Sequence, residues 1–295
     1  MIPEWLDPTL VREDPLTVAA LIAVGALIGT VGGLFGVSGC FLLTPLLGEL
    51  VGIPYRYAVG SASCHAIGIA ATALRRHLRI GKADVTLGFI IAVGAALGSF
   101  CGSQILSALS CLLSVQTVDT TIRIVLTVVL LLVAFMIARP VKADGARPLL
   151  QRIAVGPRRA LPGQPDITFS LSGTLAAAMF CGLVAGFLGL GGGVLYLPML
   201  ILAVGIEPIH AVRVSLIVVL CSAVGATIGH AWAGRASLTI AMLMMLGSSI
   251  GVQIGAHVCQ KVHGSSVRRY FALVVLGTCA MVAWKLAKQL LGWDG

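Results

Sequence analysis

Glycine is concentrated in two short stretches of the chain, each followed by a proline. The first reads GGLFGVSGCFLLTP and ends at Pro45, and the second reads GFLGLGGGVLYLP and ends at Pro198. Glycine adopts positive φ angles without penalty, so a helix can be interrupted at each stretch. A helix that restarts after such a break has unpaired N–H groups and the positive end of its dipole at its first turn. The pattern therefore predicts anion binding that needs no buried lysine.

Polar side chains in and around these stretches could take part in binding. Hydroxyl groups can donate hydrogen bonds to an oxyanion or bond back to their own helix. His65 could bind the anion, carry a proton or pack as a neutral side chain. Arg213 could attract the anion or mark the membrane boundary. The candidate binding residues are Gly36, Ser38, Gly39, Cys40, Thr44, Ser61, Ser63, His65, Gly189, Gly191, Gly192, Gly193, Arg213 and Ser215.

The composition defines the class of protein that must position these residues. Of the 295 residues, 58% are hydrophobic and only 11% are charged, and the mean hydropathy is +1.02. Soluble domains carry roughly 25% charged residues, so an ordinary soluble enzyme, a disordered chain and a disulfide-stapled domain are excluded. The apolar segments are apolar on all sides, which favours helices over a β-barrel. We predict an all-α polytopic membrane protein in a lipid bilayer.

Two uncharged runs are too long for a single membrane crossing. Pro15–Gly48 has 34 uncharged residues and Ile167–Ile206 has 40. As helices they would measure about 51 Å and about 60 Å, against a hydrocarbon core of about 30 Å. Each run must fold back or cross twice, and each contains a glycine stretch where it can do so. We expect helices that are broken or re-entrant at these glycines, and about 8–10 membrane segments.

The chain repeats itself at a constant offset of 153 residues. The glycines that recur in this register include Gly94, Gly98 and Gly102, which match Gly247, Gly251 and Gly255. Equivalent loops differ in charge: Arg75–Asp84 is strongly basic, whereas the loop around Arg235 is not. Equivalent loops on opposite sides of the membrane indicate an inverted-topology repeat. Secondary transporters are commonly built in this way, with the substrate site near the midplane.

The distribution of basic residues predicts topology and domain boundaries. The net charge is +9, and because the charges lie in short loops we attribute it to membrane topology rather than to nucleic-acid binding. The basic linker 139–166 should be cytoplasmic by the positive-inside rule, which places both termini outside the cytoplasm. The expected parts are an extracytoplasmic segment 1–14, transmembrane repeat 15–138, linker 139–166 and transmembrane repeat 167–291 of a protein of the inner cell membrane.

The doubled motif G-x-x-G-x-G-G-G-x-x-x-x-P resembles that of the sulfite exporter TauE/SafE family of membrane transporters. The second stretch, Gly186–Pro198, fits it fully, whereas the first departs from it at Ser38 and Cys40. Ser61-Ala62-Ser63 and Val214-Ser215-Leu216 resemble a Thr-Ser-Leu-like element that follows each break in the family. The resemblance covers nearly the whole chain. It implies transport of sulfur-containing oxyanions such as sulfite or organosulfonates.

We therefore expect a secondary transporter that works by alternating access around a midplane anion site, with no catalytic residue, metal or cofactor. A passive anion channel fits the repeats and breaks equally well. A thiosulfate carrier could use the cysteine thiols as weak hydrogen-bond donors, and a non-transporting subunit of a membrane complex is a further alternative. The chain has no HExxH element of an intramembrane metalloprotease. The sequence also leaves open whether the protein forms a homo-oligomer.

Overall fold

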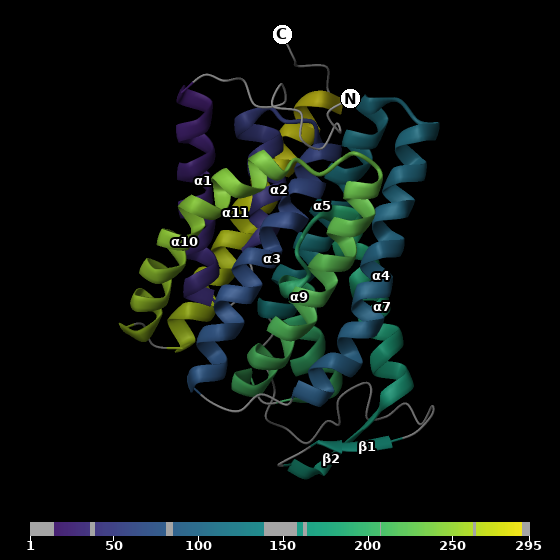
Figure 1. Ribbon diagram of the computed structural model, residues 1–295, viewed down its shortest axis with the longest axis vertical. Coiled ribbons are helices and arrows are strands. Elements are labelled where there is room, and N and C mark those ends of the chain that lie inside the picture. Colours follow the sequence, from purple (N-terminus) through teal and green to yellow (C-terminus); the bar gives the residue numbers. More distant parts are fainter. Residues whose placement is uncertain are drawn as a thin grey trace.

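The computed structural model describes residues 15–35, 39–80, 85–138, 158–161, 164–206, 208–261 and 264–290. Helices make up most of these residues (Figure 1). Within these ranges, seven helices are long and apolar enough to cross a membrane. The prediction of an all-α polytopic membrane protein is confirmed.

In the described part of the first half there are four long helices and one short helix. The long helices are α1 (Pro15–Phe35), α3 (Tyr55–Ile80), α4 (Val85–Leu112) and α5 (Val115–Ala138). Between α1 and α3, α2 (Cys40–Leu46) continues directly into a π-helix, η3 (Leu47–Val51). We call α2 and η3 together the first short helix (Cys40–Val51). The first break is the segment 36–39 that separates this helix from α1.

The second half has the same sequence of elements. The long helices are α7 (Leu171–Leu188), α9 (Pro208–Trp232), α10 (Leu238–Lys261) and α11 (Gly264–Leu290). Between α7 and α9, α8 (Gly193–Pro198) continues into the π-helix η4 (Met199–Val204). These two form the second short helix (Gly193–Val204), and the second break is Gly189–Gly192. Each long helix and each short helix of the first half thus has a counterpart in the second.

The two short helices share their internal irregularities. Each contains a proline, Pro45 or Pro198, which lacks an N–H and crowds the carbonyl four residues earlier. The wider π turns follow within two residues of each proline. Each short helix then ends at a left-handed glycine, Gly52 with φ 77° and Gly205 with φ 89°. These prolines and glycines are related by the same 153-residue offset.

Two pairs of long helices pack closely through glycine faces. A Cβ atom on Gly98 of α4 would overlap the carbonyl oxygen of Met179 in α7. A Cβ atom on Gly251 of α10 would overlap the carbonyl oxygen of Ala26 in α1. Met179 and Ala26 are themselves 153 residues apart. Each half therefore packs a helix against the other half through equivalent positions, as small residues allow in membrane helices.

Figure 1 shows that α1 begins at one end of the molecule and α7 at the other, beside strand β2. Large apolar side chains cover the outside of the bundle, among them Phe89, Phe135 and Trp232. A water-soluble monomer does not expose so much apolar surface. This surface agrees with a chain that is surrounded by lipid tails.

A two-stranded antiparallel sheet lies just before α7, where the sequence analysis predicted only a linker. It consists of β1 (Arg158–Leu161) and β2 (Gln164–Ser170), with Arg158 paired to Ser170. Ser170 also caps α7, because its hydroxyl accepts a hydrogen bond from the Gly173 N–H at 3.2 Å. The segments 1–14 and 139–157, and the site residues Gly36 and Ser38, lie outside the described residues.

Replacing either packing glycine with valine should destabilise the bundle. Gly98→Val and Gly251→Val force a side chain into a backbone contact, and such overpacking costs about 1–3 kcal/mol. The two losses should be similar because the positions are equivalent. Gly277→Val is the matched control, since a Cβ on this exposed helical glycine meets no atom within 4 Å. Thermal melts of the purified protein in detergent test this, and equal melting of Gly98→Val and Gly277→Val would contradict it.

Candidate functional site

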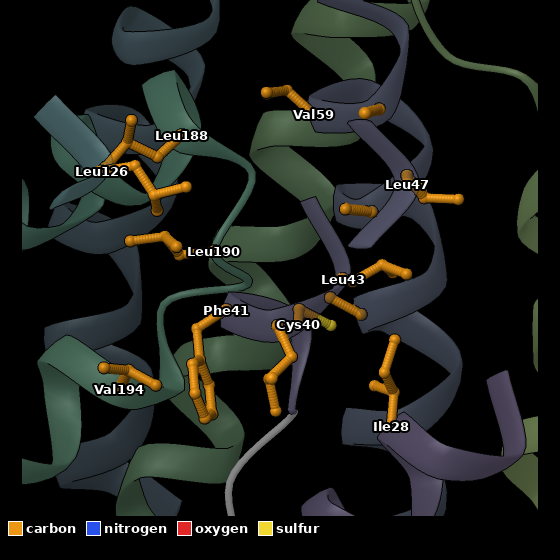
Figure 2. Packing of buried hydrophobic residues seen from close by; sticks show 14 of the residues in the cluster. Ile28, Cys40, Phe41, Leu43, Leu47, Val59, Leu126, Leu188, Leu190 and Val194 are labelled. Carbon is orange, nitrogen blue, oxygen red and sulfur yellow. The ribbon is translucent and has the colours of Figure 1, made fainter. Parts of the chain in front are cut away.

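The two breaks meet inside the bundle. Figure 2 shows Leu190 of the second break and Val194 of α8 beside Phe41 and Cys40 of α2. All four side chains are buried in one apolar cluster. Segments about 150 residues apart in the chain therefore form one centre.

Left-handed glycines shape both breaks. Gly39 has φ 63°, and in the second break Gly189, Gly191 and Gly192 have φ 66°, 62° and 72°. A side chain at any of these positions would be strained. A Cβ at Gly189 would also lie 2.6 Å from the carbonyl oxygen of Val59 in α3. Glycine is thus required at the breaks both for conformation and for the close approach of neighbouring backbone.

A hydrogen bond joins the first short helix to the second break. The hydroxyl of the buried Thr44 donates to the carbonyl oxygen of Leu188 at 3.1 Å. The carbonyl oxygen of Gly189 lies 3.3 Å from the same hydroxyl. These carbonyls belong to the end of α7, where the helix no longer supplies partners. Thr44 therefore satisfies backbone groups across the two halves.

Both short helices begin at the centre. The first follows Gly39, whose carbonyl accepts from the Leu42 N–H at 3.1 Å, and the second follows Gly192, whose carbonyl accepts from the N–H groups of Leu195 and Tyr196 at 2.9 Å. The Gly193 N–H also donates, to the Gly191 carbonyl at 3.0 Å, and the positive end of each helix dipole lies at the centre. The arrangement can attract an anion without any cationic side chain.

His65, a residue of α3, lies beside the start of the first short helix and takes part in a chain of polar contacts. Its Nδ1 is 3.9 Å from the Cys40 sulfur, and its Nε2 is 3.0 Å from the hydroxyl oxygen of Ser248 in α10. The Ser248 hydroxyl also lies 3.2 Å from the Met245 carbonyl oxygen, to which it can donate. The structure brings Cys40 and His65 together and adds Ser248, which the sequence analysis missed.

The other predicted hydroxyls are engaged in the helices themselves. Ser63 donates to the Val59 carbonyl at 3.0 Å, and Ser215 donates to the Val212 carbonyl at 2.9 Å. The Ser61 hydroxyl oxygen accepts from the backbone N–H of Ser237 at 3.1 Å. Arg213 is half-buried on the second turn of α9. The three hydroxyls are thus engaged within α3, within α9 and at the start of α10.

His230 is a second buried histidine that the binding residues did not include. Its Nε2–H donates to the carbonyl oxygen of Gly186 at 2.9 Å, one turn before the second break. It therefore braces the end of α7. Its match to His77 at the repeat offset was the signal available in the sequence. In the part of the chain that the structure describes, no three His, Cys, Asp or Glu side chains gather closely enough to hold a metal ion.

Comparison with known proteins identifies the family to which this architecture belongs. The family model described as "Sulfite exporter TauE/SafE" matches residues 21–282, from α1 to α11. The chain belongs to the TauE/SafE family. TauE/SafE membership confirms the resemblance seen in the doubled glycine motif.

Relatives of this TauE/SafE protein are named as membrane transporters. A "Probable membrane transporter protein" of Xylella fastidiosa is 28% identical over 276 residues, which cover 92% of this chain and 97% of the relative. YunE of Bacillus subtilis, with the same description, is 21% identical over 267 residues, which cover 87% of this chain and 93% of the relative. A protein of Methanocaldococcus jannaschii, MJ0441, is 26% identical over 279 residues, which cover 87% of this chain and 91% of the relative.

No solved structure matches this chain significantly. Family, relatives and apolar helices together identify a multi-pass membrane transporter that works in a lipid bilayer on a small molecule.

Removing the Thr44 hydroxyl should weaken the joint between the two breaks. Thr44→Val keeps the shape but leaves the Leu188 and Gly189 carbonyls without this donor, at a cost of about 1–2 kcal/mol. Thr72→Val is the matched control, because the exposed Thr72 hydroxyl donates only to Gly68 of its own helix at 2.8 Å. Thermal melts should show a clear loss for Thr44→Val and little change for Thr72→Val. Equal melting temperatures would argue against the joint.

Proposed function

We propose that this protein is a secondary transporter of small sulfur-containing oxyanions, such as sulfite or an organosulfonate, which bind where the two helix breaks meet. The observation that carries the proposal is that two helices begin at one buried centre, at Cys40 and Gly193. Backbone N–H groups and two dipole ends can neutralise an anion there. A buried cation would hold an anion strongly, whereas dipoles allow both binding and release.

The residues of the proposed site divide into backbone and side-chain contributions. The glycines let the oxyanion approach the backbone closely. Cys40 and His65 supply polar side chains at the first break, with Ser248 orienting the imidazole. We assign the remaining candidates to the same site or its lining, namely Gly36, Ser38, Thr44, Ser61, Ser63, Arg213 and Ser215.

Alternating access would use the two halves as the moving parts. Support comes from the equivalent glycine contacts of α4 with α7 and of α10 with α1, and from the starts of α1 and α7 at opposite ends of the molecule (Figure 1). We propose that residues 15–138 and 167–291 form inverted repeats in the inner membrane. The linker 139–166 would be cytoplasmic, and both termini would lie outside the cytoplasm.

Binding of anions by the purified protein tests the substrate class. Sulfite, sulfate, thiosulfate, taurine and sulfoacetate should be compared in thermal melts, with uncharged dimethyl sulfone as the control. A ligand at 100 times its Kd stabilises the folded state by about 2.7 kcal/mol. We expect at least one sulfur anion to raise the melting temperature and the sulfone to have no effect. Indifference to every sulfur anion would refute the proposed class.

Glycine variants locate the binding site. Gly192→Leu places a side chain at φ 72° and against the Tyr196 ring. Gly193→Leu is the milder variant, because Gly193 is not among the glycines with positive φ. Both should weaken anion binding at least tenfold, while Gly277→Leu, on the outer face of α11, should bind normally. If a folded Gly193→Leu protein binds as well as the wild type, the site is wrong.

Flux through reconstituted vesicles distinguishes a carrier from a passive channel. A carrier gives saturable uptake that is stimulated by substrate on the opposite side. We expect this counterflow with the anion that stabilises the protein. Linear flux without such stimulation would favour a channel.

A further inference from the structure

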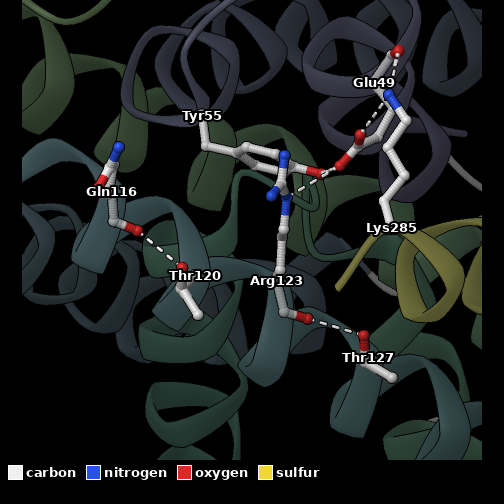
Figure 3. A network of polar contacts seen from close by, with 7 residues as sticks. All are labelled: Glu49, Tyr55, Gln116, Thr120, Arg123, Thr127 and Lys285. Atoms are coloured by element: carbon white, nitrogen blue, oxygen red, sulfur yellow. Dashed lines mark hydrogen bonds and ion pairs between the residues drawn. The ribbon is translucent and has the colours of Figure 1, made fainter. Parts of the chain in front are cut away.

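A buried carboxylate fastens the last turns of the first short helix to three other helices (Figure 3). Oε1 of Glu49 is 3.0 Å from Nε of Arg123 in α5 and accepts a hydrogen bond of 2.7 Å from the Tyr55 hydroxyl in α3. Oε2 is 3.0 Å from Nζ of Lys285 in α11. The Lys285 ammonium also donates to the backbone carbonyl of Glu49 at 3.0 Å. We call Glu49, Tyr55, Arg123 and Lys285 the carboxylate clamp.

The exposure of the clamp residues increases from the carboxylate to the cations. The side chain of Glu49 is 1% exposed, that of Arg123 18% and that of Lys285 47%. An anion from solution would therefore meet the ammonium and the guanidinium before it reached the carboxylate. Guanidinium, ammonium and phenol hydroxyl groups are also the donors that an oxyanion requires. The clamp thus resembles an anion site whose present ligand is a side chain of the same protein.

Among the residues that the structure describes, the second half has no such clamp. The residues equivalent to Glu49, Arg123 and Lys285 at the 153-residue offset are Leu202, Leu276 and Leu132. A contact required to hold a short helix in this fold would recur in both halves, as the glycine contacts do. Its presence in one half alone points to a role that the two halves do not share.

The energetics favour exchange of the carboxylate over simple release. Removing one partner from a buried ion pair leaves an uncompensated charge, whereas the pair as a whole adds little net stability. Glu49 can therefore leave Arg123 and Lys285 most readily when another anion takes its place. The cations then stay paired throughout the exchange.

We propose that Arg123 and Lys285 form an anion-recognition site, and that an incoming oxyanion displaces the Glu49 carboxylate and so releases the first short helix. The inference rests on the proposed function, because its ligand is the transported oxyanion. The site at Arg123 and Lys285 would be an entry site for the anion, separate from the site at the breaks. Glu49 and Cys40 lie near opposite ends of the same continuous helix, so release at Glu49 would be transmitted to the first break.

A distance measurement between spin labels tests the release. One label is placed at Leu50→Cys, next to Glu49, and the other at Val115→Cys, at the start of α5; both native side chains are exposed. The native cysteines other than the buried Cys40 are replaced, and the labels are attached by maleimide chemistry. With isethionate or sulfate, we expect the distance distribution to shift by several ångströms. If neither anion changes it, the proposal is overturned.

Variants of the clamp separate anion exchange from a structural ion pair. In Glu49→Gln, the distribution should be shifted without anion and should no longer respond, while Glu49→Asp should keep the response. Arg123→Gln should also abolish it, and Lys288→Gln, one turn further along α11, should leave it intact. Size-exclusion profiles identify variants that misfold. A Glu49→Gln protein that still responds as the wild type does would overturn the exchange.

Gly193→Leu distinguishes this inference from the proposed central site. This variant should lose binding at the breaks but keep the anion-dependent shift at the clamp. With Gly193→Leu as background, Glu49→Gln removes the internal competitor and should tighten anion binding in titration calorimetry. The gain should be about tenfold if the clamp is open about a tenth of the time. If the Gly193→Leu single variant loses the anion-dependent distance shift, the clamp site is overturned. If this variant binds the anion normally at the breaks, only the central site is refuted.

Discussion

A lipid bilayer offers no hydrogen-bond partners to a polypeptide backbone, so an interrupted helix must find its partners within the protein. The two glycine breaks are the places where this chain meets that constraint. Thr44 supplies a donor to the buried carbonyls at the end of α7, and His230 supplies another at Gly186. The glycine faces between α4 and α7, and between α10 and α1, hold the broken helices against unbroken ones. The rest of the bundle thus keeps the two interruptions buried and close together.

The halves are alike in backbone and different in side-chain chemistry. Both have a break, a short helix with an internal proline and a glycine at its end. The polar contacts of Cys40, His65 and Ser248 belong to the first break, and Val218 stands at the position equivalent to His65. The carboxylate clamp also belongs to the first short helix. We infer that both halves supply backbone groups and that the first half supplies most of the side-chain chemistry.

The sequence predicted the features that depend on local composition. Apolar runs without charge predicted the helices, and the glycines predicted where they are interrupted. The β1–β2 pair was missed because the linker was read only for its charge. Ser248 was missed because its meeting with His65 depends on the packing of α10 against α3. The role of Glu49 was missed because Arg123 and Lys285 are far from it in the chain. From the sequence, the hydroxyls of Ser63 and Ser215 could equally have faced a ligand. Only the side-chain rotamer decides whether such a hydroxyl bonds to a ligand or back to its own helix.

The central claim is that an oxyanion binds between the N-termini of the two short helices. The most direct measurement is an experimental structure with selenite or selenate, the selenium counterparts of sulfite and sulfate, located by anomalous scattering. We predict a selenium peak within hydrogen-bonding reach of the backbone N–H groups near Cys40 and Gly193. An anion found only at the carboxylate clamp or at the surface, with the two breaks packed closed in every state, would contradict the account.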